Sequence, residues 1–320
     1  MIQPSKRTKR NRVVVCGQKQ VAERCLDFLF EQPDAEICAI VSSPQDWQAD
    51  LISWGTARQI KVLAGNINDY LDELTELEPD FLFSLQYGPL LLSPILKLPS
   101  RGCINLHFGL LPRYGGCYPI AWAILNGEKQ AGVTLHYMTE AFDEGDIIAQ
   151  TSVPIGVETT ARELYDSATR AAVDLFATTY PAICDGTIST RKQDLSEKLY
   201  YPQNSIDFQR DRVVDWHLTA PEIQRRICAF TFEPFQLPVT SLLLPDGRVL
   251  QVTVAGVRRA KAPAGGTRRS AGRVLEVTES GGIVVATGSA DPMEIKLLDG
   301  QRALDFIESL GIAPMAISFQ

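Results

Sequence analysis

Three polar side chains in one stretch of the chain have the types and spacing needed for proton transfer beside a developing negative charge. Asn105 and His107 are separated by one residue in GCINLHF, a run that ends a predicted strand. Alternate residues of a strand point to the same face, so we expect both side chains to face one reacting centre. Asp143 follows a later predicted strand, AGVTLHYM, in a loop where Gly145 permits a tight turn.

These residue types match the demands of acyl transfer to an amine. The attacking nitrogen must lose a proton, the acyl oxygen needs a hydrogen-bond donor, and the base must be correctly oriented. His107 can accept the proton, Asn105 can donate to the oxygen, and Asp143 can orient the histidine and favour its charged form. No serine or cysteine nucleophile is required if the amine itself attacks. Taken singly, each residue also has a structural interpretation, as a strand-end histidine, a turn asparagine or a loop carboxylate.

Three other groups are better explained without catalysis. His136 lies inside the strand AGVTLHYM and is expected to be packed there. His217, in DWHLTAP, is expected at the surface. Cys117 is close to the motif, but no neighbouring residue indicates a reactive thiolate.

Alternating strand and helix patterns surround these residues. Short apolar runs predict strands, and amphipathic runs between them predict helices. The expected strands cover 12–17, 36–43, 61–65, 79–87, 102–108 and 131–138, and the expected helices cover 21–30, 50–60 and 69–77. This alternation predicts an α/β fold with a Rossmann-like, mostly parallel sheet and helices on both faces. Ligands of such sheets bind at the carboxyl ends of the strands, so we expect the chemistry after residues 87, 107 and 138.

The first strand does not lead into a dinucleotide-binding loop. Gly17 stands alone in GQKQVAE, where the phosphate-binding fingerprint requires three glycines. The sequence therefore predicts a Rossmann-like sheet without a nicotinamide cofactor.

The last third of the chain has a different pattern. A helix at 161–186 and a polar connector at 187–211 precede a helix at 219–230, where Thr219 can cap the N-terminus and Pro221 suits the first turn. Beyond it, 239–257 predicts a hairpin around Asp246-Gly247, and 271–288 and 293–300 predict further strands, with a basic loop at 261–272. We predict a flexible arm at 1–11, a catalytic domain at 12–210, and a smaller β-rich, barrel-like domain with a leading helix at 211–320.

Composition excludes several classes of protein. The 320 residues carry a formal charge of −7, which argues against nucleic acid as a partner because phosphate binding needs excess Lys and Arg. The basic start MIQPSKRTKRNR lacks the apolar region of a secretory signal, and no apolar run could span a membrane. Seven scattered cysteines without a CxxC pair indicate reduced thiols and no metal site. A cytoplasmic protein without membrane contact is expected.

The chemical segment resembles the signature of the N10-formyltetrahydrofolate-dependent formyltransferases. It contains NLH, GLLP, YGG, NGE, GVTLHYM and DEGD in the family's order and spacing. The resemblance implies that Asn105, His107 and Asp143 are the catalytic asparagine, histidine and aspartate. The C-terminal strands are similar to the small barrel that follows the transferase domain in the tRNA and aminoarabinose enzymes of this family.

The resemblance also implies a formyl donor, N10-formyltetrahydrofolate, and no metal. A flat pterin held between apolar walls and read by backbone groups fits the residue types in the matching loops. The implied folate residues are Pro89, Leu90, Leu91, Gly109, Leu110, Leu111, Pro112, Cys117, Thr139, Glu140, Ala141 and Phe142.

Departures from the family pattern bear on the acceptor. Gly115 follows Tyr114 where several members carry an arginine, which removes a clamp for phosphate or carboxylate. Cys117 stands where the aminoarabinose enzyme has an arginine, so the folate glutamate tail is expected to be held differently. The stretch 41–55 is short and acidic, whereas the tRNA enzyme has a basic insertion there.

The sequence favours a nucleotide-linked aminosugar as acceptor. KLYYPQNSIDF and ICAFTFEPFQLP are similar to the aminosugar enzymes, and Tyr201 and Phe232 could stack a nucleotide base or pack a domain junction. Tyr114, Pro119 and Trp122 are expected on the sugar side. The expected product is an N-formylated sugar for surface polysaccharide such as lipopolysaccharide. Methionyl-tRNA formyltransferase, a non-catalytic folate or nucleotide-sugar binding module, and a free amino acid or peptide acceptor stay open, as does a homodimer.

Overall fold

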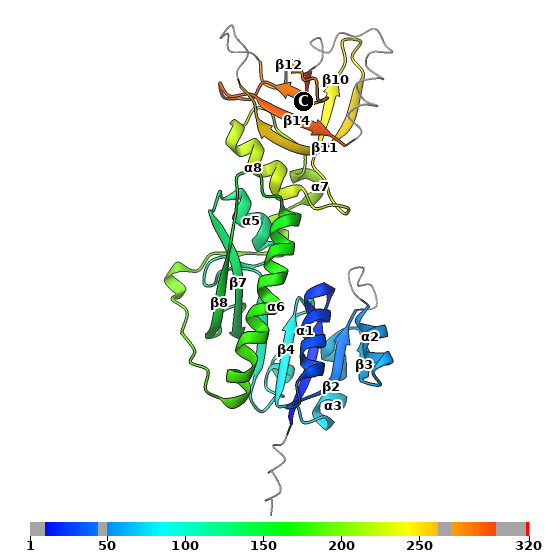
Figure 1. Ribbon diagram of the computed structural model, residues 1–320, viewed down its shortest axis with the longest axis vertical. Coiled ribbons are helices and arrows are strands. Elements are labelled where there is room, and N and C mark those ends of the chain that lie inside the picture. The colour runs from blue at the N-terminus through cyan, green and yellow to red at the C-terminus, as the bar shows by residue number, and fades with distance from the viewer. Residues whose placement is uncertain (1–9, 44–49, 262–269, 299–317, 320) are drawn as a thin grey trace, which may run out of the picture. The chain divides into compact units, whose positions relative to one another are not determined.

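The computed structural model describes residues 10–43, 50–261, 270–298 and 318–319 (Figure 1). The chain divides into two compact units, each assembled from separate stretches. The first contains 1–117, 131–153 and 166–201, and the second contains 118–130, 154–165 and 202–320. Most of the predicted arm, most of the predicted basic loop and part of the acidic stretch 41–55 lie outside the described residues. The domain boundaries at residues 11 and 210 stay a prediction.

The first unit is built on a seven-stranded sheet with the order β3-β2-β1-β4-β5-β7-β8. Five neighbouring strands, β3 to β5 in this order, are parallel, and β7 is antiparallel to β5. This confirms the Rossmann-like, mostly parallel sheet. Its strands are β1 (Asn11–Gly17), β2 (Ala35–Ser42), β3 (Lys61–Ala64), β4 (Phe81–Leu85), β5 (Cys103–His107), β7 (Gln130–Tyr137) and β8 (Ile147–Pro154).

Helices cover both faces of this sheet. The helices are α1 (Lys19–Glu31), α2 (Leu51–Ala57), α3 (Leu71–Glu76), α4 (Ser93–Leu96) and α6 (Ala161–Asp185). On one face, Leu82 of β4 packs in a buried cluster with Leu74 of α3 and Ile95 of α4. On the other, the adjacent Phe83 meets Phe176 of α6 edge-on at 5.0 Å, and α1 lies beside α6 (Figure 1). The alternation of strand side chains thus gives each face its own apolar layer.

The second unit contains a curled antiparallel sheet. Its order is β12-β13-β14-β11-β10-β15, formed by β10 (Val239–Leu243), β11 (Val249–Arg259), β12 (Val274–Val277), β13 (Ile283–Val285), β14 (Met293–Leu297) and β15 (Ser318–Phe319). A bridge between Arg273 and Ser318 joins the two ends of this order, so the sheet curls into a half-barrel. The predicted hairpin is β10–β11, and Gly247 occupies its turn with φ of 85°.

Helix α8 (Ala220–Phe230) closes the core of the half-barrel. Ile223 and Ile227 are buried with Trp216 among the strand residues. Thr219 is the N-cap, as predicted, and it forms a capping box in which its backbone N–H and hydroxyl both donate to Glu222. The same unit holds α5 (Pro119–Leu125) and α7 (Phe208–Asp211).

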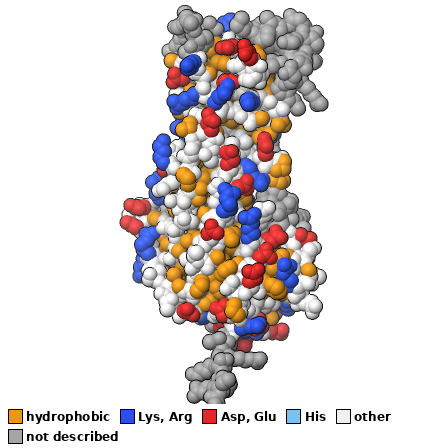
Figure 2. Space-filling model, in the orientation of Figure 1, with side chains coloured by type: hydrophobic (Ala, Val, Ile, Leu, Met, Phe, Trp, Pro, Cys, Tyr) orange, Lys and Arg blue, Asp and Glu red, His pale blue; other side chains and the backbone are white. Residues whose placement is uncertain are grey.

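The surface carries charges of both signs. Figure 2 shows Lys and Arg side chains interspersed with Asp and Glu over the described parts of this face. Within the described residues, no helix is both long and apolar enough to cross a bilayer.

Candidate active site

The register between β5 and β7 assembles the first half of the site. Asn105 pairs with His136 across the two strands, and His107 pairs with Thr134. Directly paired residues of antiparallel strands share a face, so two histidines and the asparagine meet on one side of the sheet. The Asn105 Nδ2 amide lies 3.2 Å from His136 Nε2.

The loop after β7 supplies Asp143 by an unexpected route. We expected the chemistry at the carboxyl ends of the strands, after residues 107 and 138, but β5 and β7 are antiparallel, so these two strand ends lie at opposite edges of the sheet. Tyr137, the last residue of β7, lies opposite Ile104 at the start of β5. The loop therefore returns over the sheet to bring Asp143 to His107. Asp143 is left-handed in this loop (φ 55°), and a Cβ on Gly145 would overlap the Tyr137 carbonyl, so only glycine fits there.

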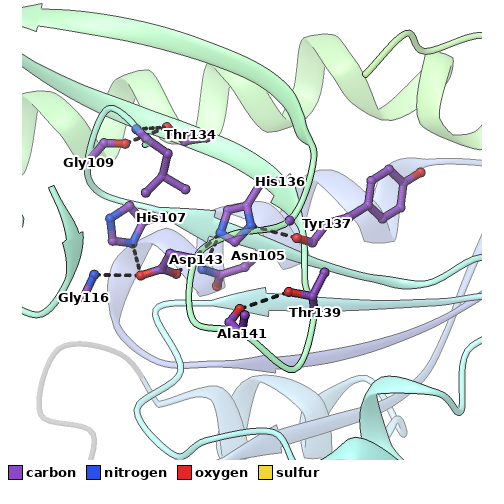
Figure 3. A network of polar contacts seen from close by, with 12 residues as sticks. Asn105, His107, Gly109, Gly116, Thr134, His136, Tyr137, Thr139, Ala141 and Asp143 are labelled. Atoms are coloured by element: carbon purple, nitrogen blue, oxygen red, sulfur yellow. Dashed lines mark hydrogen bonds and ion pairs between the residues drawn. The ribbon is translucent and has the colours of Figure 1, made fainter. Parts of the chain in front are cut away.

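The Asp143 carboxylate lies between the two histidines (Figure 3). Oδ2 accepts a hydrogen bond of 2.7 Å from the Gly116 N–H and lies 3.9 Å from His107 Nδ1. Oδ1 lies 3.7 Å from His136 Nε2. These separations from the rings exceed hydrogen-bond length, and such contacts commonly shorten when a substrate fills the site.

Backbone contacts fix the tautomer of His107. Its Nε2 lies 2.7 Å from the Tyr114 carbonyl oxygen, which can only accept, so Nε2 carries a proton. In the neutral ring the lone pair then belongs to Nδ1, the nitrogen that faces Asp143. A proton taken up at Nδ1 forms an imidazolium beside the carboxylate, so His107 is arranged to act as a base.

His136 has the opposite tautomer. Its Nδ1 donates to the Tyr137 carbonyl at 2.8 Å, which leaves Nε2 as the acceptor for the Asn105 amide. Burial is the main cause that lowers the pKa of His136 to about 4, and the neighbouring His107 lowers it further. The ring is therefore neutral near pH 7 and sets which way the Asn105 amide points. His136 is buried, as expected, but sequence reasoning missed this contact, although Asn105 and His136 both stand in the family signature.

Two further pKa shifts support Asp143 as a charged partner of the histidines and argue against Cys117 as a nucleophile. Burial raises the pKa of Asp143, but His107, the Gly116 N–H, His136 and Lys198 together outweigh it, and the net pKa is lowered. The carboxylate is charged at neutral pH. Burial, and then the charge of Asp143, raise the pKa of the Cys117 thiol, which argues against a nucleophilic thiolate. Among the described residues, no cluster of three or more His, Cys, Asp or Glu could hold a metal ion.

Comparison with known proteins places this arrangement in a family. The model of the formyl transferase family matches residues 10–179, more than half of the chain. The chain belongs to the formyl transferase family. A methionyl-tRNA formyltransferase of Alkaliphilus oremlandii is 30% identical over 289 residues, which cover 87% of this chain and 88% of that protein. The bifunctional polymyxin resistance protein ArnA of Wigglesworthia glossinidia brevipalpis is 37% identical over 168 residues, 52% of this chain and 25% of that protein.

Solved structures share the fold of this formyltransferase. An N-formyltransferase from Helicobacter canadensis, in complex with folinic acid and dTDP-3-aminofucose, has a TM-score of 0.70 at 22% identity and covers 90% of this chain and 99% of its own. WlaRD, a sugar 3N-formyl transferase solved with dTDP and 5-N-formyl-THF, also has a TM-score of 0.70 at 22% identity, over 91% of this chain and 99% of its own.

The residues predicted to bind folate lie in three loops of the first unit, except Cys117, which follows the short strand Gly115–Gly116. Pro89, Leu90 and Leu91 follow β4, Gly109–Pro112 follow β5, and Thr139–Phe142 lie between β7 and β8. Leu90 and Phe142 are about half exposed, whereas Leu91 is buried. The Ser93 hydroxyl donates to Glu140 at 2.6 Å, which ties α4 to the β7–β8 loop.

A buried hydrogen-bond network shapes the second of these loops. Thr134 donates to the Gly109 carbonyl at 2.6 Å and accepts from the Leu111 N–H at 3.2 Å (Figure 3). Gln150 donates to the Leu111 carbonyl and to Thr134, both at 2.8 Å. These bonds fix the backbone of Gly109 and Leu111, just after His107.

The predicted acceptor residues are divided between the units. In the first, Tyr114 is buried and stacks on Tyr201 with ring centroids 5.9 Å apart. In the second, Pro119 begins α5, Trp122 donates to Ser205 at 3.1 Å, and Phe232 meets Tyr165 edge-on.

Proposed function

We propose that this formyltransferase moves a formyl group from N10-formyltetrahydrofolate to the primary amine of a nucleotide-linked aminosugar. The observation that carries the proposal is the cluster of Asn105, His107 and Asp143 over one face of β5, where an imidazole that can accept a proton lies beside an amide donor. The product would be an N-formylated sugar for surface polysaccharide. A cytoplasmic location stays a prediction.

Each residue then has one role. The folate supplies an activated formyl group. His107 Nδ1 accepts the proton of the attacking amine, and Asp143 stabilises the resulting imidazolium from 3.9 Å. As the amine nitrogen bonds to the formyl carbon and the bond from that carbon to N10 of the folate breaks, His107 returns the proton to N10, so that tetrahydrofolate leaves. Asn105 Nδ2 donates one hydrogen bond to His136 and can donate a second to the formyl oxygen as negative charge develops there.

The loops around the cluster fit a folate donor. Leu90 and Phe142 offer exposed apolar side chains, as a flat ring requires. Thr139 donates to the Ala141 carbonyl at 3.0 Å, so side-chain contacts order the backbone between them. Structural neighbours of this chain were solved with folinic acid or 5-N-formyl-THF, which supports the same donor.

Support for a nucleotide sugar comes from the aromatic pair and the neighbours. Tyr201 is half-buried, and its ring already stacks on Tyr114, so ring stacking is the geometry this side chain adopts. The Helicobacter canadensis enzyme was solved with dTDP-3-aminofucose and WlaRD with dTDP, and both cover at least 90% of this chain.

Methionyl-tRNA is the second candidate acceptor. The observation that favours it is the 30% identity to a methionyl-tRNA formyltransferase over almost the whole of both chains, which exceeds the identity to the sugar enzymes. The net charge of −7 opposes it, because tRNA binding depends on neutralising phosphates.

Titration calorimetry separates the two acceptors before turnover is measured. We expect dTDP, UDP or GDP to bind, and Tyr201→Ala to weaken that binding by about tenfold, since one stacked base contributes about 1–3 kcal/mol. Tyr70→Ala, which removes a hydroxyl that donates to the Ala64 carbonyl of β3, is the control. Submicromolar, salt-sensitive binding of initiator tRNA without nucleotide binding would instead select the second candidate. If folate binds but no amine is formylated, the chain acts as a non-catalytic binding module.

A further inference from the structure

A segment far along the chain from Asp143 holds the loop that carries it. We call this segment, residues 191–201, the strap. Sequence analysis assigned it to a polar connector, yet it contacts the β7–β8 loop repeatedly. The backbones of Arg191 and Ile147 exchange two hydrogen bonds of 2.8 Å, and the Lys198 ammonium bonds to Glu144, next to Asp143.

Gln193 makes the most direct of these contacts. Its Nε2 donates to the carbonyl oxygens of Asp143 and Gly145, both at 2.7 Å. The buried Oε1 has no hydrogen-bond partner among the described residues. A flipped amide would place Oε1 against two carbonyl oxygens, so the contacts define its orientation. All of the hydrogen bonding of this side chain is therefore directed at the loop.

The two accepting carbonyls belong to a strained turn. Asp143 is left-handed, with φ of 55°, a conformation that costs free energy for residues other than glycine. Such a conformation persists only where surrounding contacts over-determine it. Gln193 bonds to the carbonyl of Asp143 itself and to the one two residues later, so it holds the backbone at and just after the left-handed residue.

The other end of the strap holds Gly116, whose N–H donates to the Asp143 carboxylate. The Leu199 carbonyl accepts from the Gly115 N–H at 2.9 Å, and the Tyr201 carbonyl accepts from the Cys117 N–H at 2.7 Å. These bonds pair β6 (Gly115–Gly116) with β9 (Tyr200–Tyr201) in parallel. The Gly116 N–H that bonds to Asp143 is thus fixed by the same segment that fixes the Asp143 backbone.

We propose that Gln193 is a positioning residue for formyl transfer, which holds the Asp143 carboxylate between His107 and His136 through its two hydrogen bonds to the turn. This inference rests on the proposed function for its effect on catalysis, but its structural part needs neither donor nor acceptor. Gln193 is too far along the chain for spacing to reveal it, because a side chain that bonds to a distant backbone leaves no periodic pattern.

The structural part is tested on the uncomplexed protein. In Gln193→Met the two donors are lost at nearly constant volume, and we expect the pKa of Asp143 to rise as its partners are displaced. Carbon-13 NMR titration of the Asp143 carboxyl, assigned with Asp143→Asn, measures this. Gln32→Met is the matched control, since half-buried Gln32 donates to the Phe28 carbonyl at the end of α1. Gln193→Leu replaces the first variant if it does not fold.

The catalytic part is read from steady-state kinetics. Loss of an orienting contact typically costs about 10–100-fold, so we expect Gln193→Met to lower kcat by that factor with KM for the formyl donor within about twofold. An unchanged Asp143 titration, or kcat close to that of Gln32→Met, would overturn the proposal. If the unmodified enzyme formylates no acceptor, the proposed function fails while the titration still decides the role of Gln193.

Discussion

Each histidine of the site has one ring nitrogen bonded to a backbone carbonyl, and the two rings are fixed in opposite tautomers. His107 presents Nδ1 to Asp143, whereas His136 presents Nε2 to Asn105. The Tyr114 carbonyl belongs to the loop after β5, and the Tyr137 carbonyl belongs to the last residue of β7, so the backbone of the fold sets both tautomers. The His107 ring can therefore act as a base while the His136 ring orients the Asn105 amide, although the two ring centroids are only 6.4 Å apart.

Replacement of His107 tests its role as the base that accepts the amine proton. We expect His107→Ala to lower kcat by about 10²–10⁴, the usual contribution of a general base, and Asp143→Asn to lower it because the imidazolium loses its counter-charge. Circular dichroism provides the control for folding. Near-native turnover in either variant would remove the role assigned to that residue.

His136 predicts a pH dependence of stability. Its pKa falls from 6.5 to about 4 on folding, so the unfolded chain binds more protons between these values. The stability that the buried, neutral His136 contributes is fully present above about pH 6.5 and is lost as pH falls toward 4. By linkage it removes about 2 kcal/mol of the free energy of unfolding between about pH 7 and pH 5. Urea unfolding of His136→Gln should show a flatter profile; identical profiles would contradict the assignment.

At the scale of elements, the alternation of strands and helices predicted the sheet and its two helical layers correctly. It did not reveal that β7 is antiparallel to β5, since strand direction depends on how the connection returns and not on the strand residues. The position of Asp143 beside His107 consequently followed only from the resemblance. The strap was missed for a related reason, because Gln193 and Lys198 act through contacts with residues about fifty positions away.

The pairing of β6 with β9 gives a test with a close internal control. Gly116 has φ of 83°, and a Cβ there would overlap the Tyr201 carbonyl. Gly247 has nearly the same φ, 85°, but a Cβ there would meet no atom within 4 Å. We expect Gly116→Ala to separate β6 from β9 and lower kcat at least about tenfold, whereas Gly247→Ala should cost only about 1 kcal/mol of stability. Equal kinetics for the two variants would contradict the account.

At the scale of the whole molecule, the half-barrel has a core of its own. Trp216 is buried there, contacts Phe319 at 5.3 Å between ring centroids, and donates to Thr240 at 2.9 Å. We expect Trp216→Ala to cost about 3–5 kcal/mol, as large buried aromatic side chains do. Hydrogen exchange in peptides from β10 and β14 should accelerate strongly. Protection equal to that of the unmodified chain would show that Trp216 does not hold this core together.

The acceptor decides the function of the whole chain, and one turnover assay tests it most directly. N10-formyltetrahydrofolate is offered with dTDP-, UDP- and GDP-linked aminosugars and with initiator methionyl-tRNA, and the products are weighed by mass spectrometry. We predict the mass gain of one formyl group on a nucleotide-linked aminosugar, and its loss in His107→Ala. Formylation of the methionyl-tRNA alone would contradict the proposed acceptor, and no formylation of any amine would contradict the proposed function.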